Sequence, residues 1–545
     1  MRKREHEVMR LAKPKKKGLL RLIFSRFFVI LSLIILQIAI IYSVFAKFAQ
    51  FLPHFQVIQT GFLIIMVIYL FNSSMDASAK LTWMMILTVV PLPGAIFLVF
   101  TKQELGYTGF SKRLKEIVRD SKDVITQSED LIDYLAQDRS GTAELCKYVN
   151  RQGCYPVYDN TDVTYFPLGE DKFERLLVEL SKAEKYIYLE YFILEEGYMW
   201  GKILEILAEK AKAGVDVRVM YDGTCEITTL PHDYTKRLEK LGIRSKMFSP
   251  LMPLVSTYFN YRDHRKILVI DGRVAFNGGV NLADEYINRK QKYGHWKDTA
   301  IMLEGKAAES FALMFLQMWN VTEKEVNLTR EDYCRLIEPP AASEDSFDRS
   351  LGDSNQTDEG VPLKGYVMPY ADSPMDADKV GENVYMDILY KANDYVHIMT
   401  PYLILDGEMK TALKFAAERG VDVKIILPGI PDKKVTNALA KSYFYEIVDS
   451  GVKLYEYTPG FVHAKVFVSD DIKGTVGTIN LDYRSLYHHF ECATYLYQTS
   501  CIADMEEDFQ ETLAKCREVT FDTIRKEKLF TKLTGRVARL AAPLM

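Results

Sequence analysis

The chain has 545 residues and a hydrophobic content of 48%, which is enough for two to four domains with sizeable buried cores. Its formal net charge of −4 argues against a dedicated nucleic-acid-binding protein, so we expect no nucleic-acid partner. The seven cysteines are scattered and odd in number, which excludes a disulfide framework, and the absence of CxxC and HExxH patterns leaves a zinc site without support.

The first segment, residues 1–26, is strongly basic. Ten lysines and arginines stand there against two glutamates. A basic stretch of this kind favours contact with anionic membrane lipids.

Three uncharged apolar stretches follow, at 27–46, 57–71 and 81–100, each near or at the length that spans a bilayer. We therefore predict a transmembrane region at 27–100 with two to three helices, in a membrane-embedded, multi-pass protein of the cell membrane. Basic residues after the third stretch and the shortness of the second favour two crossings and a cytoplasmic catalytic part. Three crossings, which would place that part outside, stay open.

After a connecting segment at 101–160, the chain repeats itself at a spacing of about 200 residues. Each half alternates apolar strand-like runs with helix signals, and a glycine ends the helix, which predicts βαβ units and an α/β fold. The predicted strands and helices lie at 183–194, 203–211, 213–223 and 267–270, and again at 393–405, 409–417, 419–429 and 466–468. The predicted domains are 161–337 and 363–545, separated by an acidic linker at 338–362.

The pattern His-x-Lys-x4-Asp occurs once in each half. An asparagine lies 17 residues after each histidine, and an acidic residue follows it. The matched polar positions predict one bipartite active site, built from His264, Lys266, Asp271, Asn281 and Asp298 in the first half and from His463, Lys465, Asp470, Asn480 and Glu491 in the second.

These residue types suit phosphate chemistry. Alternate side chains of a strand share a face, so each histidine projects with its lysine and one phosphate can touch both. One neutral imidazole can attack phosphorus while a second imidazolium protonates the leaving oxygen. Lysines and asparagines can hold the non-bridging oxygens, so we expect neither a metal nor another cofactor.

The two aspartates of the motif have a different character. Asp271 opens an Asp-Gly turn and Asp470 lies in an Asp-Asp pair, so within the candidate catalytic motif we expect them to fix a turn or strand end. His295, His488 and His489 lie near the two acids, and we expect them to be supporting or solvated residues. Residues 524–540 have leucines at helical spacing among basic residues, which predicts either a helix on the lipid surface or an ordinary docking helix.

These motifs resemble the phospholipase D superfamily and, within it, the bacterial cardiolipin synthases. The resemblance rests on NYRDHRKILVIDG (260–272), GGVN (278–281), HWKDT (295–299), TPYLI (400–404) and VHAKVFVSDD (462–471), and it covers nearly the whole chain. It implies two duplicated phospholipase D-type α/β domains related by a pseudo-two-fold axis, with the site between them and transmembrane helices before them. It also implies that two phosphatidylglycerol molecules are converted to cardiolipin and glycerol.

Carried onto this chain, the resemblance implies that His264 attacks phosphorus and forms a phosphatidyl-histidine. His463 would protonate the departing glycerol and then deprotonate the hydroxyl of the second lipid. The phosphate would be bound by Lys266, Lys465, Asn281 and Asn480, and the imidazoles would be oriented by Asp298 and Glu491. The near-symmetry of the two motifs does not itself choose the nucleophile.

The chain departs from the family pattern at two places. PYADSPMD (369–376) stands where relatives commonly show Ser-Gly-Pro-Asp, and His488 and His489 stand where an asparagine is common, so the recognition of the acceptor lipid is open.

Two alternative functions also stay open. A membrane-anchored phosphodiesterase that hydrolyses phospholipid would use the same residues, with water as acceptor. A non-catalytic lipid-binding scaffold would not require both complete motifs.

Overall fold

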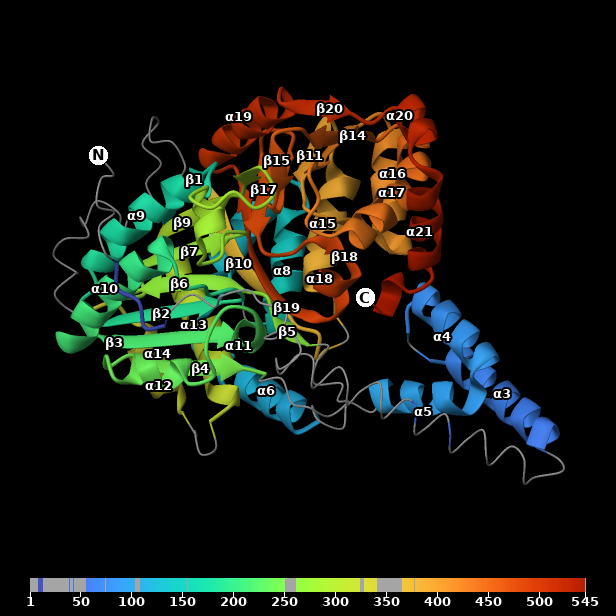
Figure 1. Ribbon diagram of the computed structural model, residues 1–545. Helices are drawn as coiled ribbons and strands as arrows, with labels where there is room; N and C mark the ends of the chain where they lie inside the picture. Colours follow the sequence, from blue (N-terminus) through green and yellow to red (C-terminus); the bar gives the residue numbers. More distant parts are fainter. Residues whose placement is uncertain are drawn as a thin grey trace, which may run out of the picture.

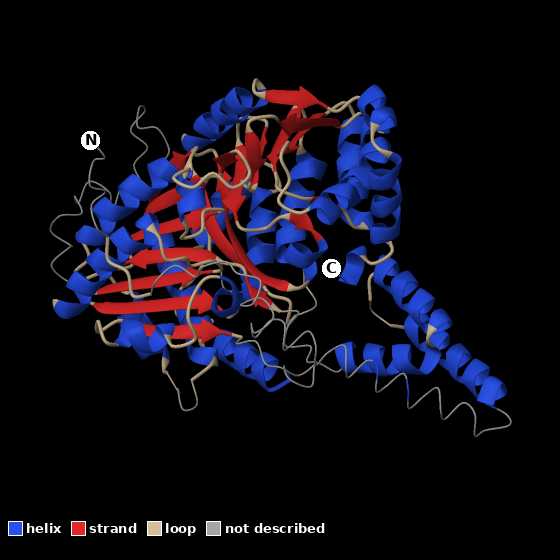
Figure 2. Cartoon of the chain, viewed as in Figure 1, coloured by secondary structure: helices blue, strands red, loops and turns tan. Residues whose placement is uncertain are grey.

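The computed structural model describes residues 8–12, 39, 43, 55–73, 75–102, 108–153, 155–249, 261–323, 328–340, 365–376 and 378–544. Two β-sheets form the body of the molecule, and helices cover their outer faces (Figures 1 and 2). Most of the basic segment 1–26, the first apolar stretch 27–46 and the linker 338–362 lie outside the described residues.

The first half is built on one mixed sheet. Its strand order is β1 (Thr161–Phe166), β9 (Ala300–Gly305), β7 (Val274–Gly278), β6 (Lys266–Ile270), β2 (Tyr186–Tyr191), β3 (Asp216–Asp222) and β4 (Arg244–Phe248). Its helices are α9 (Gly169–Ser181), α10 (Tyr198–Lys212), α11 (Thr224–Thr228), α12 (Tyr234–Glu239), α13 (Ala307–Val321) and α14 (Arg330–Ile337).

The second half repeats this order. Its sheet runs β10 (Tyr366–Asp372), β19 (His489–Tyr497), β17 (Lys473–Gly477), β16 (Val466–Ser469), β11 (Tyr395–Met399), β13 (Asp422–Pro428), β14 (Lys453–Tyr457) and β20 (Cys516–Glu518). Its helices include α15 (Val380–Lys391), α16 (Gly407–Glu418), α17 (Lys434–Asp449), α18 (Tyr483–Tyr487) and α19 (Cys501–Leu513).

The pairing directions match as well as the order. In both sheets the first four neighbouring pairs are antiparallel and the next two are parallel. The first parallel pair of each sheet, β2 with β3 and β11 with β13, is joined by one helix, α10 or α16, as a βαβ unit requires. The predicted duplicated α/β fold is confirmed.

The halves share a continuous apolar core. Every residue of α13 is buried, and this helix packs against strands of both sheets, together with apolar residues from β16, β17 and β19. Phe315 of α13 stacks on Tyr188 of β2 with ring centroids 4.8 Å apart. Helix α13 therefore holds the two halves together as one packed unit.

The segment predicted as a connection, 101–160, contributes to both halves. Helix α6 (Thr108–Asp120) packs on α13, whereas α7 (Glu129–Gln137) and α8 (Thr142–Gly153) complete the core of the second half. Amphipathic helices of this kind bury one apolar face. In the connecting segment, α6 buries its apolar face against the first half, and α7 and α8 bury theirs against the second half.

Helices α3 (Phe55–Phe71), α4 (Ala77–Val89) and α5 (Pro91–Lys102) project from the body (Figure 1). The second apolar stretch falls in α3, but the third, 81–100, is not the single helix expected, because it breaks at Val90. Pro91 restricts the residue before it to extended conformations, and Val90 has φ −135° and ψ 73°. Across the described residues, we find no helix with both the length and the apolar character needed to cross a membrane.

Three further strand pairings lie outside the two strand orders. Strand β5 (Arg262–Asp263) of the first half pairs with β19 of the second, and β8 (His295–Lys297) pairs with β15 (Gly460–Val462). The third pair, β12 (Leu403–Ile404) with β18 (Leu481–Asp482), lies within the second half. The first two pairs are direct backbone links between the halves.

Asp271 and Asp470 lie at the ends of β6 and β16 away from the histidines, and both have φ 53°. The Asp271 carboxylate accepts hydrogen bonds of 2.8 Å from the backbone N–H groups of residues 184, 185 and 186. Asp470 does the same for residues 393, 394 and 395, at 2.8–3.0 Å. The two aspartates therefore do not belong to the predicted active site. Each carboxylate instead fixes the start of a neighbouring strand, as the turn sequences indicated.

Replacing Asp271 with alanine removes a buried anionic acceptor of three backbone N–H groups. We expect Asp271→Ala to lower the free energy of unfolding by about 2 kcal/mol, which thermal unfolding in detergent would show as a lower midpoint. Asp159→Ala, at an exposed position, is the control. Equal midpoints for the two variants would contradict a stabilising role for Asp271.

Candidate active site at the junction of the two halves

The first histidine of the motif is held by an acid of the other half. His264 follows β5, and its backbone N–H donates to the carbonyl of Phe490 at 2.9 Å. Its Nδ1 lies 2.9 Å from both carboxylate oxygens of Glu491 on β19. Glu491 is fully buried and also accepts from the Thr478 hydroxyl. This arrangement leaves Nε2 of His264 as the ring nitrogen available to a ligand.

The second histidine has the mirrored arrangement. His463 follows β15, and its backbone N–H donates to the carbonyl of Lys297 at 2.7 Å. Its Nδ1 lies 2.7 Å from Asp298 Oδ2, while Asp298 Oδ1 accepts from the backbone N–H of Thr299 at 2.9 Å. Each acid predicted from the sequence therefore contacts the histidine of the opposite half.

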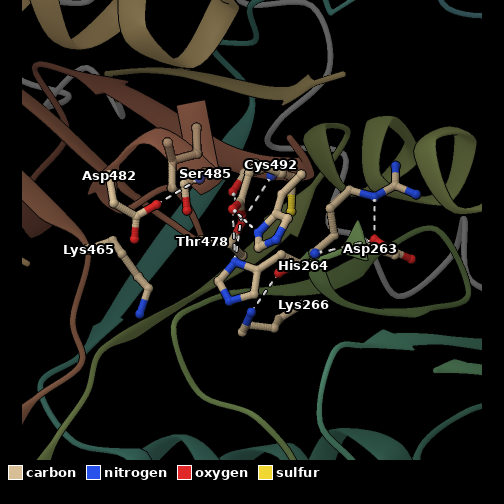
Figure 3. A network of polar contacts seen from close by, with 12 residues as sticks. Asp263, His264, Lys266, Lys465, Thr478, Asp482, Ser485 and Cys492 are labelled. Atoms are coloured by element: carbon tan, nitrogen blue, oxygen red, sulfur yellow. Dashed lines mark hydrogen bonds and ion pairs between the residues drawn. The ribbon is translucent and has the colours of Figure 1, made fainter. Parts of the chain in front are cut away.

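The two lysines of the motif are also buried. Lys266 Nζ donates to the carbonyl of His264 at 2.5 Å, and Lys465 Nζ donates to the carbonyl of His463. Figure 3 shows His264 beside Lys266 of the same half, with Lys465 of the other half to one side of them. Burial lowers the pKa of Lys266 to about 8 and the pKa of Lys465 to about 7.

The two asparagines differ in their free hydrogen-bonding capacity. Asn281 accepts from the backbone N–H of Ile193 at 3.0 Å and donates to the Tyr286 hydroxyl at 2.9 Å. Asn480 has a buried Oδ1 with no hydrogen-bond partner among the described residues. A buried amide oxygen is costly to leave unpaired, so Asn480 is the asparagine suited to a ligand.

Both histidines and both asparagines line one cavity of about 680 Å³ between the halves. Aromatic rings form much of the remaining wall, and some pack on the imidazoles, as Phe192 does on His264 and Tyr286 on His463, with centroids 5.0 and 5.4 Å apart. The sequence analysis did not identify these wall residues, which are Phe192, Tyr286, Tyr293, Trp296, Tyr402, Phe461 and Tyr483. Trp296 and Tyr402 lie within the motifs HWKDT and TPYLI but were given no role there, and the others come from separate loops and strands that no quoted motif covers.

Burial controls the charge of the imidazoles. It lowers the pKa of His264 well below its ordinary value and the pKa of His463 to about 4, and the neighbouring lysines act in the same direction. Burial would raise the pKa of Asp298, but attraction from His463, their hydrogen bond and Lys465 outweigh it and keep the pKa low. Before substrate binds, the site at neutral pH therefore combines neutral imidazoles with an ionised Asp298.

His489 lies in the cavity wall, although the sequence predicted a supporting or solvated residue. It is only 7% exposed, it lines the cavity, and its ring centroid is 5.3 Å from that of His264. Neither of its ring nitrogens has a hydrogen-bond partner among the described residues, although Nδ1 lies 3.6 Å from Glu491 Oε1. A sequence signal was present, since His489 and Glu491 are alternate residues of one strand and share a face.

The other two histidines have supporting contacts. His488 Nε2 lies 3.4 Å from the carbonyl of Pro543, and His295 Nδ1 lies 3.1 Å from the Tyr457 hydroxyl. Neither lines the cavity.

Two groups of possible metal ligands occur among the described residues. In the first, the ligand atoms of His264, His489 and Glu491 lie within 4.8 Å of one another, but a cation there would compete with the His264–Glu491 hydrogen bond. The second is an acidic cluster of Glu382, Asp406 and Glu408, where Lys379 Nζ already lies 3.1–4.0 Å from the three carboxylates.

Known proteins resemble both halves. A family model described as the phospholipase D-like domain of cardiolipin synthase matches residues 176–319 and 385–513, and each segment contains one histidine of the motif. The chain is 56% identical to an uncharacterized protein of Streptococcus mutans over 479 residues, which cover 88% of this chain and 99% of that protein. It is 31% identical to a cardiolipin synthase of Alkalihalophilus pseudofirmus over 480 residues, 88% of this chain and 91% of the relative.

A solved structure shows the same fold. The phosphatidylserine synthase of Haemophilus influenzae has a TM-score of 0.51 and 16% sequence identity, over 70% of this chain and 93% of that chain.

The two buried lysines predict oxyanion binding that depends on pH. Sulfate stays dianionic from pH 6 to 9, whereas Lys465 and Lys266 lose their charge as pH rises through about 7 and 8. We expect the sulfate affinity, measured by calorimetry, to fall by about tenfold for each charge lost. Lys465→Met should weaken binding at pH 6, unlike the exposed control Lys434→Met. Exposed lysines stay charged in this range, so constant affinity in the native protein would contradict the assignment.

Proposed function

Because the chain belongs to the cardiolipin synthase family of phospholipase D-like phosphatidyltransferases, we propose that it converts two phosphatidylglycerol molecules to cardiolipin and glycerol. The observation that carries this proposal is the pair of imidazoles in one cavity, each held at Nδ1 by an acid of the other half. Two histidines with free Nε2 atoms suit a double displacement, in which one acts as nucleophile and the other as acid and base.

In the first step, Nε2 of His264 attacks the phosphorus of one phosphatidylglycerol. The bond from phosphorus to nitrogen forms as the bond to the glycerol oxygen breaks, and His463 gives its proton to that oxygen. Burial favours the neutral, nucleophilic form of His264, and Glu491 stabilises the positive charge that the imidazole gains on phosphorylation.

His463 must carry a proton for this step. Asp298 raises its pKa through their hydrogen bond, and the bound phosphodiester anion adds a second negative charge close to the ring. In the second step, His463 removes the proton from a hydroxyl of the second phosphatidylglycerol. That oxygen attacks phosphorus, the bond to nitrogen breaks, and His264 is restored.

The transferring group needs positive charge and hydrogen-bond donors around its non-bridging oxygens. Lys266 and Lys465 supply charge from a buried environment, where electrostatic stabilisation is stronger than in water. Asn480 also lines the cavity, where its amide N–H groups can donate to these oxygens and its unpaired Oδ1 can accept from a lipid hydroxyl. Asn281 instead positions Tyr286 in the cavity wall. The aromatic wall offers the acyl-bearing part of the lipid an apolar surface.

We also propose that helices α3, α4 and α5 hold the protein at the cell membrane. They enclose only a small core of Met66, Leu70, Trp83, Leu87, Ala95 and Leu98. Their outer faces expose large apolar side chains that water solvates poorly, namely Val57, Ile64, Ile65, Ile68, Phe71, Leu81, Met85, Val89, Ile96 and Phe97.

The central test is to incubate the purified protein with phosphatidylglycerol and identify the products by mass spectrometry. We expect cardiolipin with matching glycerol release, and a loss of about a thousandfold in His264→Ala and His463→Ala. The control is His232→Ala, an exposed histidine outside the cavity. Rapid quenching should trap the phosphatidyl group on His264, and the activity should persist in chelator. Phosphatidate as the main product would instead establish a hydrolase.

The acids provide a second test, with a readout in pH. Because Asp298 raises the pKa of His463, Asp298→Asn should move the alkaline limb of kcat, which reports the substrate complex, to lower pH and reduce the maximal kcat by about 10²- to 10⁴-fold. Glu491→Gln should reduce kcat to a similar extent with little change in KM, because it acts through His264. An alkaline limb that stays in place in Asp298→Asn would contradict the assigned role of His463.

A further inference from the structure

The C-terminal helix α21 (Leu529–Arg539) is packed with its small residues inward. Gly535 faces α17 so closely that a Cβ atom there would lie 2.1 Å from the carbonyl oxygen of Ala438. On the same side, Arg539 stacks on the ring of Tyr443, 4.2 Å from its centroid. The helix therefore contacts the body of the protein through a narrow face.

The large apolar side chains of α21 point the other way. At 100° per residue they fall on one face, opposite Gly535. These side chains are exposed rather than buried against the body. Their exposed fractions are 81% for Leu529, 80% for Phe530, 60% for Leu533, 59% for Val537 and 52% for Leu540. A helix that served only to dock on the body would not leave this whole apolar face exposed, so the exposure favours the lipid-surface alternative from the sequence.

Positive charge lies beside this apolar face. A cleft of about 560 Å³ is bounded by α17, α20 (Phe521–Lys526) and α21, and basic side chains line it. Lys441 and Arg517 within it are paired with Glu456 or Glu527. Within the described part of the chain, no acidic side chain forms an ion pair with the other basic residues of the cleft, namely Arg525, Lys526, Lys528, Lys532 and Arg536.

The apolar face continues toward the proposed membrane helices and the active site. The Thr82 hydroxyl of α4 donates to the carbonyl of Leu540 at 2.8 Å, so α21 ends against that helix (Figure 1). The next residues form η5 (Ala542–Leu544), in which Ala542 lines the catalytic cavity. The exposed face of α21, helix α4 and the edge of the cavity are thus neighbours.

We propose that α21 and the basic cleft bind the surface of an anionic phospholipid bilayer and hold the opening of the cavity against it. The apolar face would enter the acyl boundary, while the cleft takes the lipid phosphates. This arrangement delivers lipid substrate from the bilayer to the histidines, and that part of the inference rests on the proposed function.

The first test is photolabelling of the full-length protein, reconstituted in vesicles that contain a phosphatidylglycerol with a diazirine at mid-chain. We expect labelled peptides from residues 529–540, and no label on the exposed control side chains Phe415 and Val178. The inactive His264→Ala variant should label equally, so this result does not depend on turnover. The absence of label from 529–540, or crosslinks between two protein chains in its place, would overturn the proposal.

The second test separates membrane docking from chemistry. We expect the combined variant Leu529→Ser, Phe530→Ser, Leu533→Ser and Val537→Ser to lose about tenfold or more of its turnover on phosphatidylglycerol vesicles. Its turnover on dispersed short-chain phosphatidylglycerol should stay within about twofold of the native rate, because these side chains contact neither the core nor the cavity. The matched control is Phe415→Ser with Val178→Ser. Equal losses on both substrates, or none on vesicles, would overturn the proposal.

Charge gives a third, independent readout. Lys528→Gln with Lys532→Gln and Arg536→Gln should reduce labelling of 529–540, and added salt should do the same for the native protein, because surface attraction to anionic lipid is screened. Labelling unchanged by either treatment would remove the cleft from the proposal.

Discussion

The active site depends on two short parallel pairings between the halves, β5 with β19 and β15 with β8. Each pairing ends at a histidine whose backbone N–H donates to the opposite strand, at 2.9 Å for His264 and 2.7 Å for His463. The imidazole of each histidine then contacts the acid of the opposite half, Glu491 for His264 and Asp298 for His463. Neither half contains a complete pair of histidine and acid, so the docking of the two sheets around α13 is a condition for the chemistry.

These pairings also solve an energetic problem. Glu491, Asp298, Lys266 and Lys465 are almost completely buried, and a buried charge without a partner costs several kcal/mol. The crosswise hydrogen bonds satisfy the acids, and the histidine carbonyls satisfy the lysines. The same burial lowers the pKa values of the imidazoles and lysines. The environment that imposes a desolvation cost on the buried charges therefore also keeps the nucleophilic imidazole neutral.

The surface features favour one orientation toward lipid. Helices α3 to α5 and the outward face of α21 are apolar, they meet where Thr82 contacts Leu540, and Ala542 brings the same region to the cavity. Under the proposed function the enzyme would take both lipids from one bilayer, and an opening beside the proposed lipid-binding surface would supply them without extraction into water. The breaks in the apolar stretches, such as Val90 before Pro91, then shape this surface into several short helices.

The sequence by itself determined the duplication, the α/β class and the residue types of the site, because these depend on local patterns: strand alternation, glycine stops and the repeated His-x-Lys-x4-Asp. It also indicated that Asp271 and Asp470 hold strand ends, since turn chemistry is local. Only the tertiary structure decided which acid serves which histidine, because the partners are separated by 227 residues for His264 and Glu491 and by 165 for His463 and Asp298. The place of His489 in the cavity and the outward face of α21 were decided in the same way, because both depend on which elements pack together, and a linear pattern does not specify its neighbours.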